Sequence, residues 1–344
     1  MLRKLQKFAI AAIAASTGAI LTSPAIAGTL TKAGISGTAS NDYLIYDANS
    51  TETFVVPNTS ANLQKVLEGN SSKPTGNVEL AASSEKTGFD FTKSTSLTGK
   101  LGGLDLTISS LTVDDWMSDV GGTTFGQKWF NETLSNNGFG NLSILQKDLL
   151  FSSFKEYGGF QRFSDPNISY INQDDQTGLI RIGLAGHLNA TPLLTQSVDQ
   201  LTAKLQQDLT KAKADLAKLP KNPPAGPVKT AKQQLESAIT SLNSSLLLVE
   251  GMKTTLSAQT IQASEIFKYA YNGKTGYGYS FSATQSGLKA ADDRTSHTGN
   301  YEVTFQGVPP ETVPEPSAVL GLIGFGSVLV VRRQMQKRSV LTNQ

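Results

Sequence analysis

Apolar residues between positions 193 and 258 recur every three or four places, in two successive series separated by a proline-rich break at 220–227. This spacing puts the apolar side chains on one face of an α-helix, and no helix crosses a cluster of prolines. Two helices joined by a short break pack antiparallel. The pattern therefore predicts a helical hairpin over residues 193–258. The two series are Leu194, Val198, Leu201, Leu205, Leu209, Ala212, Leu216 and Leu219, and then Val228, Ala231, Leu235, Ala238, Leu242, Leu246, Val249, Met252 and Leu256.

The remainder of residues 28–308 shows the shorter period of β-strands. Apolar residues alternate with polar ones on both sides of Gly102-Gly103, and tyrosines alternate around Asn272-Gly273. Both dipeptides favour tight hairpin turns. We therefore predict a mainly β domain over residues 28–308, a β-sandwich or jelly-roll-like body with the helical hairpin inserted at one of its loops. Other strands are expected near 42–47, 53–56, 77–80, 89–91, 179–186 and 300–305, and short helices near 61–67 and 142–154.

Residues 1–27 have the parts of a secretory signal peptide. Basic residues precede an apolar segment at 8–21, and Ala25 and Ala27 form an A-x-A cleavage site. We therefore expect export across a membrane, with Gly28 as the first residue of the mature chain.

The C-terminus carries three segments in a fixed order: a proline-rich linker at 309–317, an apolar run at 318–331 and a basic tail at 332–344. A helix over the 14 residues of the run spans about 21 Å, which is short against a hydrocarbon core of about 30 Å. We expect a transmembrane segment that anchors the chain only transiently, with the basic tail in the cytoplasm. The marked residues here are Val313, Pro314, Glu315, Pro316 and Ser317 in the linker, and Arg332 and Arg333 in the tail.

This arrangement resembles the PEP-CTERM sorting signal of exported bacterial proteins, from the Pro-Glu-Pro tripeptide to the arginine-rich end. The resemblance implies an exosortase as partner, cleavage near Pro314–Pro316, and delivery to the cell surface or the extracellular matrix. The alternative is an ordinary single-span anchor. The body is also similar to a cyanobacterial-type family of PEP-CTERM proteins without an assigned activity, and the stretches that carry this similarity are 41–44, 158–170 and 271–277.

Composition narrows the choice of partners. The chain has no cysteine, so an exported body must be held together by burial rather than by disulfides. Seven of its 30 basic residues lie in the leader or the tail, which leaves 23 against 28 acidic residues, a net charge of about −5. Nucleic acid is therefore excluded as a partner, because its binding depends on a basic surface.

Acidic and amide side chains suggest a calcium site. Asp-Asp pairs occur at 114–115, 174–175 and 292–293, and the middle pair follows three further oxygen-bearing residues, Asp165, Asn167 and Asn172. Calcium takes six to eight oxygen ligands, but the spacing of an EF-hand is absent. Asp and Asn are also common turn formers. The candidate calcium ligands are Asp165, Asn167, Asp174 and Asp175, and no other cofactor is expected.

Four aromatic residues are candidates for stacking on sugar rings: Trp116, Trp129, Tyr277 and Tyr279. The alternative, which we favour, is that they fill the protein core. Catalytic patterns are sparse. The chain has two histidines, His187 and His297, and no G-x-S-x-G motif. Adjacent aspartates in a strand also point to opposite faces. We therefore expect a non-enzymatic structural or adhesive protein of an exopolysaccharide matrix or biofilm. The alternatives are a carbohydrate-binding module and, second, a secreted glycoside hydrolase.

Overall fold

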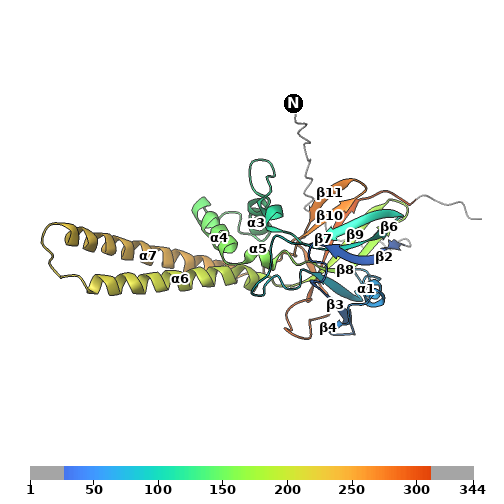
Figure 1. The fold of residues 1–344 in the computed structure, drawn as a ribbon, viewed down its shortest axis with the longest axis horizontal. Helices are drawn as coiled ribbons and strands as arrows, with labels where there is room; N and C mark the ends of the chain where they lie inside the picture. The colour runs from blue at the N-terminus through green and yellow to red at the C-terminus, as the bar shows by residue number, and fades with distance from the viewer. Residues whose placement is uncertain (1–26, 311–344) are drawn as a thin grey trace, which may run out of the picture.

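The computed structural model describes residues 27–310, and these fold into two antiparallel β-sheets and a set of helices (Figure 1). The mainly β fold with a helical hairpin agrees with the prediction. The larger sheet has the order β12 (Ala283–Gln285), β13 (Gly299–Gln306), β9 (Leu179–Gly186), β8 (Asn167–Asp174), β5 (Gly76–Leu80), β3 (Tyr43–Ala48) and β4 (Thr53–Val56), with β1 (Ala27–Thr29) paired to β8. The smaller sheet has the order β11 (Lys274–Gly278), β10 (Phe267–Tyr271), β7 (Leu104–Ser109), β6 (Thr95–Leu101) and β2 (Thr31–Gly37).

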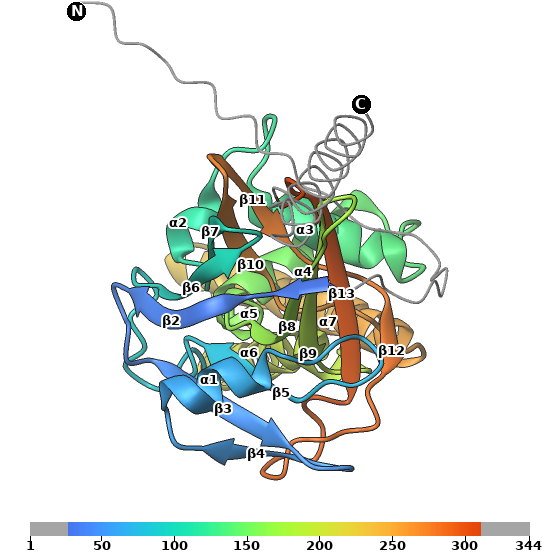
Figure 2. The same ribbon diagram turned by 90° about the vertical axis from the view of Figure 1, so that its right-hand side faces the viewer.

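One hydrophobic core lies between the two sheets. Strands of both sheets contribute buried side chains, such as Ile108 from β7 and Ile182 from β9. The rings of Tyr269 on β10 and Phe305 on β13 stack across the interface with centroids 4.4 Å apart. Figure 2 shows β2 crossing the direction of β13 steeply, so the sheets are packed crosswise rather than aligned. The helix α1 (Ser60–Val66) adds Leu63 and Val66 to the same core.

Both hairpin turns predicted from dipeptides are present. Gly102 and Gly103 connect β6 to β7, and both have positive φ angles, of 58° and 85°. Asn272 and Gly273 connect β10 to β11 with φ angles of 47° and 74°. Two successive positive φ angles match the twist of the flanking strands, which is why Asn-Gly and Gly-Gly are favoured there.

The predicted helical hairpin is confirmed as α6 (Thr191–Ala217) and α7 (Pro227–Ser257). The two helices run antiparallel and project away from the sheets as a long arm (Figure 1). Pro227 starts α7 at a position where a missing N–H costs nothing. An ion pair between Asp199 and Lys253 links the two helices near the body.

A second core of aromatic residues surrounds the base of the arm. It is formed by α2 (Val113–Met117), α3 (Phe125–Asn136), α4 (Ile144–Glu156) and α5 (Gly159–Arg162) together with the base of the arm. Val198 from α6 and Met252 from α7 are buried in it. The arm is therefore anchored in a helical layer, of which the sequence predicted α4, as the helix near 142–154, but not α2, α3 or α5.

One strand prediction was wrong. Residues 89–91 form no strand but lie in a loop, although the spacing of the two phenylalanines is that of a strand. The side chain of Phe91 is half-buried against the aromatic core, so the apolar residue serves helix packing rather than a sheet.

The two ends of the described chain meet at the turn between β8 and β9. The backbone N–H of Gly28 donates to Asp175 Oδ1 at 3.3 Å, and Gln173 Nε2 donates to the carbonyl of Val308 at 2.7 Å. Ala27 and Gly28, which flank the expected leader cleavage point, both belong to β1. The remaining leader residues, including Ala25, and the C-terminal segments from 311 onward lie outside the described residues. Within 27–310, none of the helices combines the length and apolar character needed to span a bilayer.

Candidate functional site

The four aromatic candidates for sugar binding are all in the protein core. Trp116, Trp129 and Tyr279 are 0 % exposed and Tyr277 is 6 % exposed. Trp116 stacks on Phe160 at a centroid distance of 4.4 Å. A buried ring has no free face for a sugar, so the proposal of sugar stacking by these residues is wrong. The alternative weighed for them, packing in the core, agrees with their positions.

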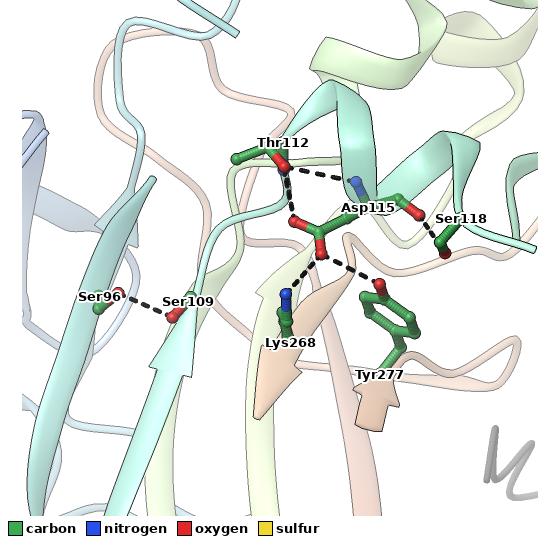
Figure 3. Close-up of polar contacts among 7 residues, drawn as sticks. All are labelled: Ser96, Ser109, Thr112, Asp115, Ser118, Lys268 and Tyr277. Carbon is green, nitrogen blue, oxygen red and sulfur yellow. Dashed lines mark hydrogen bonds and ion pairs between the residues drawn. The ribbon is translucent and has the colours of Figure 1, made fainter. Parts of the chain in front are cut away.

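Tyr277 and Asp115, the second residue of the first Asp-Asp pair, belong to one structural cluster (Figure 3). Asp115 caps α2 together with Thr112, and its Oδ1 accepts hydrogen bonds from Lys268 Nζ at 2.7 Å and Tyr277 Oη at 3.0 Å. Burial would raise the pKa of Asp115, but the bonds from Lys268 and Thr112 outweigh it and lower that pKa. This cluster ties α2 to the smaller sheet and has no unused polar group, so it is structural.

The proposed calcium ligands do not form one site. Asp165 and Asn167 lie at the start of β8, whereas Asp174 ends it, which places the two groups about 23 Å apart. Asp174 Oδ1 accepts the backbone N–H groups of Gln176 and Thr177 in a turn. Across residues 27–310, no three acidic or imidazole groups come close enough to hold a metal ion. The single calcium loop is therefore wrong as a geometric proposal.

A polar cavity of about 200 Å³ lies where the larger sheet meets the helical layer. Its rim is exposed and includes residues of the loops after β5 and before β13, and its floor is buried. We call this cavity the acidic pocket. Its polar lining comprises Tyr46, Glu79, Ser84, Glu85, Lys86, Arg162, Asp165, Asn167, His187, Glu265, Asp292, Asp293, Ser296 and His297.

Asp165 is the most deeply placed carboxyl group of the acidic pocket. Its residue is 9 % exposed, and its Oδ2 accepts a hydrogen bond from Ser84 Oγ at 2.6 Å. Its other oxygen, Oδ1, is buried and has no hydrogen-bond partner. A buried polar atom without a partner costs about 1–3 kcal/mol, so this oxygen is a position where a ligand group would be stabilised.

His297 orients the next carboxyl group through an amide. His297 Nε2 lies 3.2 Å from Asn167 Oδ1, and Asn167 Nδ2 donates to Glu265 Oε2 at 3.3 Å. On the other side of the ring, Nδ1 lies 2.6 Å from the hydroxyl of Thr53. The arrangement fits a neutral imidazole with its proton on Nε2. His297 also has a φ angle of 63°, which is uncommon for a buried side chain of this size.

The pKa values of the most buried groups in the acidic pocket are shifted toward uncharged forms, whereas at the rim burial is outweighed by hydrogen bonds from Ser296 and Thr295, which lower the pKa of Asp293. Burial raises the pKa of Glu79 to about 7, against a hydrogen bond from Tyr46. Burial also raises the pKa of Glu265, against the bonds from Asn167, and burial with the charge of Glu265 raises the pKa of Asp165. Burial lowers the pKa of His297 to about 4. Carboxyl groups that keep their protons near neutral pH can donate hydrogen bonds or protons to a ligand.

The sequence pointed to single residues of the acidic pocket but did not indicate that they form one site. Asp165 and Asn167 were singled out as calcium ligands, whereas the two histidines were noted only as too few to indicate a catalytic pattern. No local sequence pattern pointed to Glu79 or Glu265, because Glu79 lies in β5 and Glu265 lies in the distant segment before β10. The stretch 158–170, quoted above for a family resemblance, supplies Arg162, Asp165 and Asn167 and was the one usable hint.

Comparisons with protein-family models, with curated proteins and with solved structures found no match for this chain. The proposal of a function therefore rests on the sequence, the fold and the acidic pocket.

Proposed function

We propose that this chain is an exported cell-surface protein whose β body binds a unit of an extracellular glycan in the acidic pocket. Such binding would give it a structural or adhesive role in an exopolysaccharide matrix or biofilm. The signal peptide and the PEP-CTERM-like tail support the export route. The crosswise pair of sheets with a shared core supports a β-sandwich description of the body, with the site formed by loops at one end of the larger sheet.

The observation that carries this proposal is the deeply buried carboxyl group of Asp165 in the lining of a polar cavity, with its Oδ1 free of any hydrogen-bond partner. Sugars present hydroxyl groups that both donate and accept hydrogen bonds, and this pocket offers carboxyl, amide and hydroxyl partners side by side. Its volume of about 200 Å³ is below the range of about 300–1,000 Å³ for drug-sized ligands. The size favours one sugar unit at a chain end or branch rather than a long segment.

A glycan array followed by calorimetry on residues 28–310 tests the proposal. Asp165→Asn keeps the shape of the side chain and should weaken binding about tenfold. Asp174→Asn is the matched control, because Asp174 lies at the opposite end of β8. Absence of glycan binding by the folded parent protein would reject the proposal, and equal losses in both variants would reject the acidic pocket as the site.

A secreted glycoside hydrolase is the second candidate, favoured by the raised pKa of Glu79 and of the Asp165–Glu265 pair. Glycosidases need one protonated and one ionised carboxyl group on either side of the bond that is cleaved. In that case Glu265→Gln would abolish release of sugar from a chromogenic glycoside while glycan binding remains. If the parent protein binds the glycan but does not cleave it, the result would support the non-enzymatic function proposed above.

The sorting route is a separate proposal with its own measurement. Exosortase cleavage near Pro314–Pro316 predicts a surface-released protein that lacks residues 318–344. Intact-mass spectrometry of the released protein measures this directly. A mature protein that retains these residues would support the ordinary anchor instead.

A further inference from the structure

We infer that the ligand unit in the acidic pocket carries a protonated amine, as an amine-bearing sugar does. This inference rests on the proposed glycan binding and specifies its chemistry. Two observations support it: the excess of acidic groups around the cavity, and the hydrogen-bond acceptor Asp165 Oδ1, which has no partner.

The lining of the acidic pocket has many more acidic than basic groups. Two cationic side chains, Lys86 and Arg162, line it together with six carboxyl groups. Both histidines of the pocket are favoured in their neutral form, because burial lowers the pKa of each. The six carboxyl groups belong to Glu79, Glu85, Asp165, Glu265, Asp292 and Asp293.

Neither cation neutralises these carboxyl groups directly. Within residues 27–310, none of the six forms an ion pair. Arg162 instead donates to Ser197 Oγ and to the carbonyl of Tyr157, so its guanidinium group holds α5 against the arm. Buried carboxylates are stable only when they are paired, hydrogen-bonded or protonated. The buried members Glu79, Asp165 and Glu265 each accept a hydrogen bond and are partly protonated, so a cationic ligand would take the place of those protons.

The free acceptor fits an ammonium group. Asp165 lines the cavity and its buried Oδ1 has no hydrogen-bond partner, while Glu265 accepts the hydrogen bonds of Asn167 through Oε2. An ammonium group has three donors that can point in separate directions, so it can bridge carboxyl groups that do not converge on one point. Calcium, in contrast, requires six to eight converging oxygens, and within 27–310 no such cluster of acidic groups occurs.

Binding of a cation should release protons. Glu79, Glu265 and Asp165 all have raised pKa values from burial, so part of this group is protonated near pH 7. A bound ammonium group favours the ionised carboxylates. His297 has a pKa of about 4 and Tyr46 a raised pKa, so neither exchanges protons near neutral pH. The protons released would therefore come from the carboxyl groups.

The test compares a glucosamine oligosaccharide with its fully N-acetylated counterpart by titration calorimetry on the exported protein. Acetylation removes the charge and keeps the rest of the ring. The amine form should bind about tenfold more tightly or better. Titrations at pH 7 in two buffers of different ionisation enthalpy should show proton release with the amine form only. Asp165→Asn should lose most of the preference, and Asp174→Asn should retain it.

The outcomes separate the inference from the proposed function. Equal affinity for the two oligosaccharides would overturn the inference and leave glycan binding intact. Binding of neither would overturn both. Calcium ions that bind the parent protein, but not Asp165→Asn, and displace the amine form would assign the pocket to a metal and would also overturn the inference.

Discussion

The body and the distal part of the arm, which is the part of α6 and α7 beyond the aromatic core, both carry charged side chains. Most charges of the arm are exposed, whereas several charges of the body are buried. In the arm, exposed lysines pair with acidic neighbours one turn away, as in Lys204–Asp208 at 2.6 Å. In the body, Asp115 and Asp165 are withdrawn from solvent and depend on a few specific partners. Exposed pairs contribute little to stability, whereas a buried charge that loses its partner is costly. The difference predicts where substitutions will be tolerated and where pH will matter.

The largest expected contrast concerns apolar side chains of the two regions. Trp116→Ala removes a ring that stacks on Phe160 and leaves a cavity in the aromatic core. It should lower the free energy of unfolding by about 3–5 kcal/mol. Leu216→Ala, on the distal arm, should lower it by less than about 1 kcal/mol. Urea denaturation followed by circular dichroism measures both, and similar losses would remove the distinction between core and arm.

The pH dependence should come from the body. The pKa of Glu79 is about 7 in the folded protein against 4.5 ordinarily. The folded state therefore holds this proton more tightly, and its contribution is complete below pH 4.5 and lost as the pH rises through 7. It amounts to roughly 3 kcal/mol. The difference in unfolding free energy between parent and Glu79→Gln, measured from pH 4 to 9, should follow this curve.

The matched control for that experiment is Glu236→Gln, which changes an exposed carboxyl group of the arm. Taking the difference between parent and variant also removes the contribution of His297. Burial lowers the pKa of that ring, so its contribution is lost in the opposite direction, as the pH falls from 6.5 toward 4. A flat difference curve for Glu79→Gln would contradict the buried state of its carboxyl group.

Removal of a lysine should distinguish the two kinds of ion pair. Lys268→Ala leaves the Asp115 carboxylate, whose side chain is 10 % exposed, without its cation. The expected loss is about 1.5–3 kcal/mol, as for a hydrogen bond to a charged group. Lys204→Ala breaks an exposed pair and should cost no more than about 0.5 kcal/mol. Urea denaturation measures both variants. Equal losses of unfolding free energy in Lys268→Ala and Lys204→Ala would contradict the structural role that we assign to Asp115.

The smallest expected effect is that of shortening the arm. Replacing residues 208–244 by a short glycine-rich turn should change the unfolding free energy of the body by less than about 1 kcal/mol. The helical signal in circular dichroism should fall. Deleting 197–256 instead removes Val198, Val249 and Met252 from the aromatic core and should prevent folding. If the shorter deletion also unfolds the body, the distal arm is part of its core.

The sequence predicted well those features that depend on neighbouring residues. Asn272-Gly273 and Gly102-Gly103 specify their turns through their own backbone preferences, and the spacing of leucines specifies α6 and α7. The run at 89–91 shows the limit, since its two phenylalanines have the spacing of a strand but lie in a loop beside the helical layer.

The acidic pocket could not be predicted in the same way. Its groups come from positions as far apart as Glu79 and His297, and no local pattern records which strands are adjacent. The aromatic residues were ambiguous for a related reason. A tryptophan on a short helix could either stack on a sugar or pack in the core. The contact of Phe160 with Trp116, which shows that Trp116 packs in the core, is visible only in the structure.

The meeting of the two ends of the described chain at the β8–β9 turn has a mechanical consequence. A force on either end enters the body at the same corner, where β1 adjoins Asp174 and the end of β13 adjoins Leu179. Under such a force the first hydrogen bonds to break would be those of the three residues of β1 with β8, or those between the C-terminal residues of β13 and β9. The acidic pocket adjoins Asn167, at the other end of β8 and about 23 Å from that corner. A force on the two ends of residues 27–310 would thus act at the corner of the body that is farthest along β8 from the acidic pocket.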